Sequence, residues 1–119
     1  MSYKNGRAFE YRVKHYLEEQ GYWVIRSAGS KGEADLIAFK FGETLFIQVK
    51  GNDTPLSPGE WNGLVSLTRR LGGTPIHAFR SKRKIVLNKI LSHRLPRQAG
   101  LFVKFDPDNL ENESCSNPA

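Results

Sequence analysis

Three polar side chains lie in two apolar runs of the sequence, at positions from which they could act together. Asp35 opens the run that ends near Phe39, and Gln48 and Lys50 lie two residues apart near the end of the run 44–50. Residues two apart on a β-strand point to the same face of the sheet. A hairpin between the runs would bring Asp35 beside the other two, so the pattern predicts a polar cluster on adjacent strands.

These residue types suit a divalent cation and a phosphate group. Mg²⁺ prefers hard oxygen ligands, which Asp35, the side-chain carbonyl of Gln48 and the backbone carbonyl of Val49 would supply. Glu10 could reach the ion through water or bind a second one. Lys50 could orient or deprotonate a metal-bound water, or neutralise the charge that develops on the phosphate. The cluster therefore predicts metal-assisted phosphodiester hydrolysis, with Mg²⁺ as the expected ion and Mn²⁺ as the alternative.

Each of these residues also has a simpler interpretation. Asp35 at a strand start could accept hydrogen bonds from a turn, and Gln48 could be a strand residue on a solvated face. Lys50 ends a strand, where exposed lysines are common. The catalytic hypothesis depends on all three lying on adjacent elements.

The first part of the chain supplies a helix, a strand and a loop of small residues. Residues 5–20 are predicted to form an amphipathic helix that Gly21 ends, with Glu10 at the border of its apolar stripe. Residues 22–26 are aromatic and β-branched, which is typical of a strand. In the following loop, Ser30 and Lys31 could donate hydrogen bonds to a phosphate, or the loop could be plain connecting chain.

A second helix has the clearest start signals in the sequence. Ser57 is predicted to be its N-cap, Pro58 occupies the first helical position, and Glu60 completes a Ser-x-x-Glu capping box. Two glycines at 72–73 are expected to end this helix. Beyond it we expect strands at 74–79, 85–87 and 101–105, and a short helix at 88–94.

Charge divides the chain into two parts. Residues 1–105 contain all eighteen Lys and Arg residues against eight acidic ones, a formal charge of +10, whereas 106–119 contain acidic charges alone. The basic excess favours a polyanionic partner such as nucleic acid, although a merely soluble basic protein is the alternative. Lys82, Arg83 and Lys84 form a basic turn that is either a phosphate contact or a solvated hairpin tip.

The length fits one domain, which we assign to residues 1–105, followed by an acidic tail at 106–119 that we expect to be disordered. The single cysteine, Cys115, allows no disulfide within the chain, so we expect a reducing, cytoplasmic setting. The basic charge adds the expectation that the protein is associated with DNA there. The N-terminus lacks the apolar stretch of a signal peptide, and no run is long enough to span a membrane. Neither Cys115 nor the histidines have the spacing of zinc ligands.

Several blocks of the sequence resemble one nuclease family. Asp35, followed by twelve residues and then Gln48-Val49-Lys50, is similar to the signature of the PD-(D/E)xK nuclease superfamily, with Glu10 at the place of its N-terminal acid. The blocks at 6–10, 24–31 with 35–38, and 70–75 resemble the archaeal Hjc-type Holliday junction resolvases. The resemblance covers roughly residues 4–80.

The resemblance implies a homodimeric, Mg²⁺-dependent endonuclease that cuts four-way DNA junctions. It also implies an α/β, restriction-endonuclease-like fold with a mixed central β-sheet flanked by helices. Glu10, Asp35 and Gln48 would be metal-site residues, Lys50 the catalytic lysine and Ser30 an active-site loop residue. A two-fold dimer fits a substrate with two symmetric scissile strands. The expected DNA-binding residues are Arg7, Arg26, Lys31, Lys82, Arg83 and Lys84.

The sequence departs from the family pattern at Gln48, where the family usually has Glu, and at Ala34, which replaces the proline before the aspartate. An amide at position 48 keeps one carbonyl ligand and loses a negative charge, so metal affinity is expected to fall. Two other hypotheses remain open. One is a VRR-type or restriction-like nuclease acting on flaps or duplex DNA, and the other is a junction-binding module inactivated by Gln48.

Overall fold

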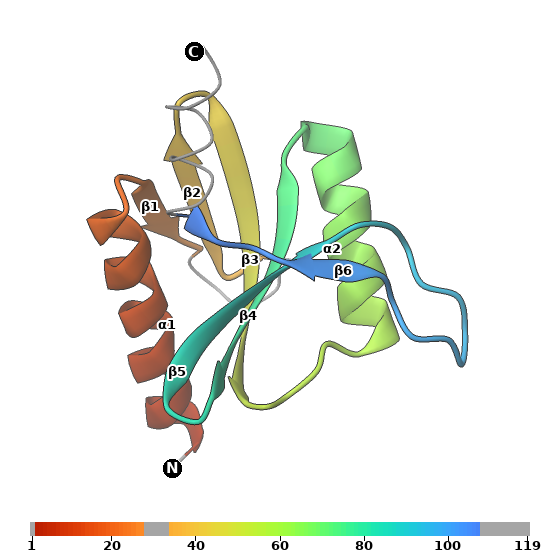
Figure 1. Ribbon diagram of the computed structural model, residues 1–119, viewed down its shortest axis with the longest axis horizontal. Helices are drawn as coiled ribbons and strands as arrows, with labels where there is room; N and C mark the ends of the chain where they lie inside the picture. Colours follow the sequence, from red (N-terminus) through yellow and green to blue (C-terminus); the bar gives the residue numbers. More distant parts are fainter. Residues whose placement is uncertain (1, 28–33, 108–119) are drawn as a thin grey trace.

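The fold is built on a six-stranded sheet whose strands follow one another in chain order (Figure 1). The structure is a computed structural model and describes residues 2–27 and 34–107. Helix α1 spans Ser2–Glu19 and α2 spans Pro58–Leu71. The strands are β1 (Trp23–Arg26), β2 (Leu36–Lys40), β3 (Glu43–Asn52), β4 (Thr74–Ser81), β5 (Lys84–Ile90) and β6 (Phe102–Lys104).

The central pair of strands, β3 and β4, is the parallel pair of this sheet. Strands β1 to β3 and strands β4 to β6 pair antiparallel with their neighbours, and α2 makes the crossover from β3 to β4. Parallel pairing brings the carboxyl ends of β3 and β4 to the same edge of the sheet. The mixed sheet flanked by helices that the resemblance implied is therefore confirmed.

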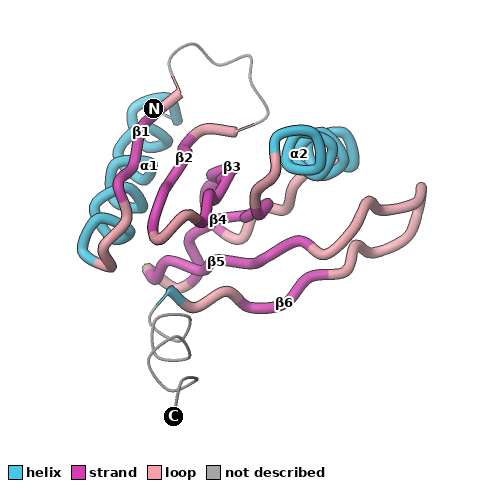
Figure 2. The backbone as a smooth tube through the Cα atoms, turned by 90° about the horizontal axis from the view of Figure 1, so that it is seen from above, coloured by secondary structure: helices cyan, strands magenta, loops and turns pink. Residues whose placement is uncertain are grey.

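The two helices lie on opposite sides of the sheet (Figure 2). Leu45 and Ile47 of β3 are buried in the core under α1, whereas Phe46 is buried in the core under α2. Because side chains alternate along a strand, Gln48 and Lys50 follow Phe46 onto the side of α2. The sequence prediction that these two residues share a face is borne out by this alternation.

The ends of both helices match their sequence signals. The Ser57 hydroxyl accepts the N–H of Glu60 at 3.1 Å, and the Glu60 carboxylate accepts the N–H of Ser57 at 2.8 Å, which completes the capping box of α2. Gly21 follows α1 with a φ of 96°, in the region that favours glycine. The chain can therefore reverse directly into β1.

The short helix expected at 88–94 is wrong. Residues 88–90 belong to β5, where Asn88 pairs with Lys104 of β6. The ladder to β6 satisfies the backbone groups of this segment, and that tertiary pairing outweighs local helix preference. Strand β3 is also longer than predicted, since it continues to Asn52, which pairs with Arg80 of β4.

Two further expectations concern a membrane-spanning helix and the acidic tail. No helix in residues 2–27 and 34–107 is long and apolar enough to cross a membrane. The tail predicted to be disordered, 106–119, lies outside the described residues from 108 onward.

Gly73, between α2 and β4, tests how closely the chain packs on the sheet. A Cβ here would lie 2.5 Å from Cε1 of the buried Phe46 and 3.0 Å from the carbonyl oxygen of Thr44. We expect Gly73→Ala to lower the free energy of unfolding by about 1–3 kcal/mol in urea denaturation. Gly59→Ala, in the first turn of α2 with nothing within 4 Å, is the matched control and should not destabilise the fold. Equal losses in the two variants would contradict this packing argument.

Candidate active site

The predicted polar residues gather at one edge of the sheet, the lower edge in Figure 1. The carboxyl ends of β3 and β4 meet there with the start of β2, the end of β1 and the first turn of α2. Every one of these elements ends or begins at this edge, so short side chains from different elements come within reach of one another. This edge is the candidate active site.

Asp35 lies directly before β2 and is bound to β3 through both its main chain and its side chain. Its N–H donates to the carbonyl of Ile47 at 2.7 Å, and its Oδ2 accepts the N–H of Val49 at 2.8 Å. The register pairs Leu36 with Ile47, so the next step of the ladder sets Asp35 opposite Gln48. The adjacency predicted from the two apolar runs is therefore present.

Burial raises the pKa of the Asp35 carboxyl above its ordinary value. The N–H of Val49 and the charge of Lys50 lower this pKa, whereas the negative charges of Glu10 and Glu60 raise it further. Ionisation of Asp35 is thus opposed by lost hydration and by two acidic neighbours, and a bound cation would relieve both. The electrostatics of this carboxyl favour cation binding.

Lys50 is bound by Glu60, an acid whose sequence pattern indicated helix capping alone. The Lys50 Nζ donates to Glu60 Oε2 at 2.6 Å, and the other oxygen of that carboxylate accepts the N–H of Ser57. Burial raises the pKa of Glu60, but the hydrogen bonds from Lys50 and Ser57 lower it by more, so the net shift is downward. Glu60 is the residue that sequence reasoning missed, and its position in the first turn after β3 was the available signal.

Glu10 forms an ion pair with Arg26, the last residue of β1. The Arg26 Nε donates to Glu10 Oε1 at 3.0 Å, and its guanidinium lies 5.4 Å from the ring centroid of Tyr11. The residue after Arg26, Ser27, donates its N–H to the carbonyl of Asp35 at 2.9 Å. The pair therefore borders Asp35, with Glu10 acting on it through charge.

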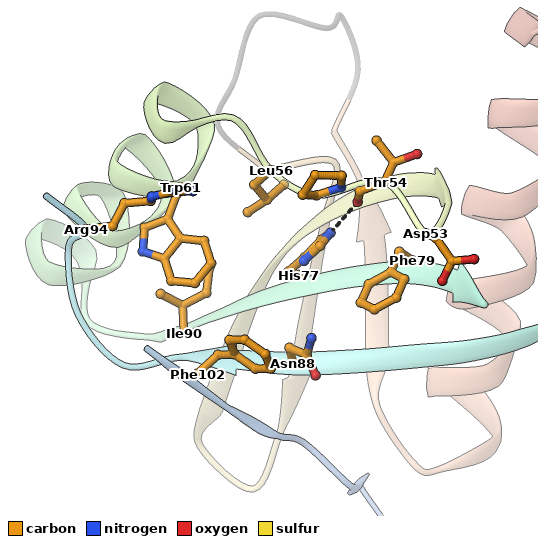
Figure 3. Close-up of a pocket in the computed structure, with 11 residues that line it drawn as sticks. Asp53, Thr54, Leu56, Trp61, His77, Phe79, Asn88, Ile90, Arg94 and Phe102 are labelled. Carbon is orange, nitrogen blue, oxygen red and sulfur yellow. Dashed lines mark hydrogen bonds between the residues drawn. The ribbon is translucent and has the colours of Figure 1, made fainter. Parts of the chain in front are cut away.

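A buried histidine lies on the neighbouring strand at the level of Gln48. His77 is in register with Gln48 across β3 and β4, and its Nε2 donates to the carbonyl of Thr54 at 3.0 Å (Figure 3). Burial lowers the pKa of His77, and the bond to Thr54 opposes this only in part. The ring is therefore neutral at pH 7. It lines a cavity of about 280 Å³ together with Trp61 and Phe79.

The basic turn between β4 and β5 lies against α1. Lys82 and Arg83 have positive φ values of 52° and 67°, as in a tight two-residue hairpin turn. Arg12 of α1 donates to the carbonyl of Arg83 at 2.6 Å, which ties the turn to the helix. The residues at 82–84 and Arg7 are exposed, whereas the predicted loop residues Ser30 and Lys31 lie outside the described residues.

The donor set around Asp35 fits a hard divalent cation in kind. Asp35 offers a carboxylate, Gln48 an amide carbonyl and Val49 a main-chain carbonyl, and waters with substrate phosphate commonly complete such a shell around Mg²⁺. Within residues 2–27 and 34–107 there is no cluster of three or more His, Cys, Asp or Glu side chains that could hold a metal ion. Of the three donors named here, Asp35 supplies a charged oxygen, whereas Gln48 and Val49 supply neutral ones.

Known proteins match this chain in sequence and in fold. The family model described as archaeal Holliday junction resolvase (Hjc) matches residues 1–110. The "Crossover junction endodeoxyribonuclease Hjc" of Methanocaldococcus jannaschii is 38% identical over 81 residues, which cover 66% of this chain and 60% of that protein. A "UPF0102 protein" of Kosmotoga olearia is 37% identical over 60 residues, which cover 49% of this chain and 52% of that protein. The chain thus spans less than two thirds of the length of either relative.

A solved structure supports the same grouping. Hjc of the hyperthermophile Archaeoglobus fulgidus, described as a Holliday junction resolvase, matches with a TM-score of 0.64 and 28% sequence identity. The match covers 86% of this chain and 84% of that one. The similarity therefore extends over most of both chains.

Asp35→Asn is expected to stabilise the fold at neutral pH. Because the pKa of Asp35 is raised in the folded state, ionising this carboxyl costs stability as the pH rises through that folded pKa. Asparagine avoids the cost and can still accept the N–H of Val49. In urea denaturation with EDTA, the variant should exceed the wild type in free energy of unfolding at pH 7, and the difference should shrink toward about pH 4. A variant less stable than the wild type at pH 7 would contradict the assigned shift.

Proposed function

Because the chain belongs to the archaeal Holliday junction resolvase (Hjc) family, we propose that it is a metal-dependent endonuclease that cuts four-way DNA junctions. The observation that carries this proposal is the contact of Asp35 with the main chain of Val49, which sets an acid, an amide and a lysine at one sheet edge. The Methanocaldococcus relative is named a crossover junction endodeoxyribonuclease and the Archaeoglobus relative a Holliday junction resolvase, which supports the substrate class.

In this proposal the side chains at the sheet edge divide the work of phosphodiester hydrolysis. Lys50 orients the attacking water or neutralises the negative charge that develops on the phosphate. Asp35 would hold the cation, which would offset the cost of its own buried charge. Glu10, paired with Arg26, places a second negative charge beside Asp35. Ser30 keeps the role of an active-site residue that the family resemblance implied.

Mg²⁺ is the proposed ion, and Mn²⁺ would use the same ligands. Asp35, Gln48 and the main-chain carbonyl of Val49 would hold it, with Glu10 acting through water. When bound, the ion activates a water and stabilises negative charge on the phosphate. Gln48 offers a carbonyl without charge, so we expect weaker metal binding than a carboxylate at this position would give.

The basic groups around this edge are proposed to contact DNA phosphates. Residues 1–105 carry a formal charge of +10, and the turn fixed by Arg12 presents three exposed basic side chains beside α1. Lys and Arg contacts with phosphate fix the register of a protein on DNA without reading its sequence. The proposed contacts are Arg7, Arg26, Lys31, Lys82, Arg83 and Lys84.

We also propose that two copies form a two-fold dimer, since a four-way junction has two symmetric scissile strands. Strand β6 is the outermost strand of the sheet, next to β5. Apolar side chains on β6 and in the segment before it are about half or more exposed. They are Leu95, Leu101, Phe102 and Val103. A second copy would bury such a surface.

Cleavage of a synthetic four-way junction, compared with linear duplex of the same sequence, tests the proposed activity. With Mg²⁺ we expect symmetric nicks in the junction, and with EDTA none. Asp35→Asn should abolish the nicks and leave junction affinity within about threefold, because removing an anion does not weaken attraction to phosphate. Asp53→Asn, at an exposed carboxyl after β3, is the matched control and should cut as the wild type does.

Other outcomes of this assay distinguish the alternatives. Equal cutting of flaps or duplex would favour a restriction-like nuclease over a junction resolvase. Tight junction binding without cutting, with cutting restored by Gln48→Glu, would identify a binding module whose metal site the amide has inactivated. Loss of junction binding in Asp35→Asn would contradict the metal-site assignment.

Light scattering on the purified chain tests the dimer. We expect a mass of twice 13.5 kDa, and a shift toward the single-chain mass in Leu101→Glu, because a buried charge without a partner opposes association. Phe41→Glu alters an equally apolar and still more exposed side chain, in the turn between β2 and β3, and should leave the mass unchanged. A single-chain mass for the wild type at the concentrations used for cleavage would argue against the dimer.

A further inference from the structure

Lys50 has a carboxylate partner at the active edge, and that partner comes from α2. The 2.6 Å contact joins Lys50 Nζ to Glu60 Oε2, and the two side chains are only 24% and 34% exposed. A partly buried pair of this kind loses less to solvent screening than a pair at the open surface. The contact therefore restricts where the lysine amine can lie.

The Glu60 carboxylate is itself held in place. Its Oε1 accepts the N–H of Ser57 at 2.8 Å, so both oxygens are engaged, one by the helix cap and one by Lys50. The N-terminus of a helix also favours a negative charge, and the net downward shift in the pKa of Glu60 agrees with this. Glu60 is a fixed, ionised group at neutral pH.

The other polar groups of the centre are less suited to bind the lysine. Gln48 shares the face of Lys50 but is uncharged. Asp35 directs its Oδ2 to the N–H of Val49 and is disfavoured as an anion by burial. The charge of Glu60 also acts on Asp35 and on His77, so its influence extends across the edge.

We propose that Glu60 is a positioning residue of the nuclease: its carboxylate holds the Lys50 amine at the sheet edge. It gives that amine the negatively charged partner that the neutral Gln48, on the same face, does not provide. This inference rests on the proposed function, because it assigns Lys50 a part in cleavage. One carboxylate thus caps α2 and orients the catalytic lysine.

Glu60→Gln is the central test, since an amide oxygen can still accept the N–H of Ser57 while the charge is lost. We expect kcat for junction cutting to fall about 10- to 100-fold, as for a displaced catalytic group, with KM within about threefold. The unfolding midpoint should stay close to that of the wild type. An intact kcat would overturn the proposal, and so would a fall in kcat that accompanies a general loss of stability.

Two control variants separate positioning from other effects of the substitution. Glu18→Gln breaks a lysine–glutamate pair of similar length, the 2.8 Å contact of Lys14 with Glu18 on α1, and should leave kcat unchanged. Ser57→Ala removes the capping hydroxyl and leaves the Glu60 carboxylate, so it should lower the unfolding midpoint without the fall in kcat. A fall in kcat with Ser57→Ala equal to that with Glu60→Gln would assign Glu60 to capping alone and overturn the proposal.

An exchange variant tests whether the negative charge itself is the contribution. Gln48→Glu combined with Glu60→Gln returns a carboxylate to the face of Lys50 from the neighbouring strand position. Because Gln48→Glu alone is expected to strengthen metal binding, the comparison is made within that background: Glu60→Gln should cost at least tenfold less in kcat in the Gln48→Glu variant than in the wild type. An equal loss of kcat in both backgrounds would mean that the charge of Glu60 is not what the lysine needs.

The side-chain ammonium signal of Lys50 in ¹H–¹⁵N spectra gives a readout that is independent of cutting. It should shift or broaden in Glu60→Gln and remain in place in Glu18→Gln. An unchanged signal would overturn the proposal whatever the cleavage rates are. A wild-type protein that binds junctions and cuts none would instead contradict the proposed function, and the ammonium signal would still decide whether Glu60 holds Lys50.

Discussion

The attachment of Asp35 to β3 is the constraint on which the active edge depends. Its main-chain N–H extends the β2–β3 ladder by one step to Ile47, and its carboxylate accepts the N–H of Val49. These two bonds hold Asp35 opposite Gln48, although burial disfavours the charge of its carboxylate. A slip of one residue in this ladder would turn Gln48 and Lys50 toward the core under α1. The chemistry of the site is therefore set by strand register.

Two ion pairs and one further carboxylate surround the neutral amide of Gln48 at this edge. Arg26 offsets Glu10, and Lys50 offsets Glu60, so within residues 2–27 and 34–107 Asp35 is the carboxylate of this group that has no ion-pair partner. An added cation would therefore meet one unshared charge, together with the uncharged oxygen of Gln48. In the proposed reaction, substrate phosphate would bring further negative charge to the edge, and a metal there would be bound jointly by protein and DNA.

The sequence was sufficient for whatever depends on local pattern. Alternation in β3 predicted that Gln48 and Lys50 share a face, and the capping box predicted the start of α2. The contact between Lys50 and Glu60 could not be predicted, because it depends on how the crossover after β3 turns α2 back over the sheet. The alignment of His77 with Gln48 likewise needs the parallel register of β3 and β4. The helix expected at 88–94 failed for the same reason, since pairing with β6 is a tertiary effect.

The sheet consists of two antiparallel meanders that are joined by the β3–β4 pair. Asp35, Gln48 and Lys50 belong to the first meander, whereas Glu60 and His77 come from the crossover and the second. Hairpins close short loops at low entropic cost, whereas pairing β3 with β4 requires the longer crossover to close at a higher cost. A chain that has folded only as far as β3 thus has its acid and lysine without the group that restrains the lysine. The proposed catalytic centre thus needs both halves of the sheet, because Glu60 lies in the crossover that joins them.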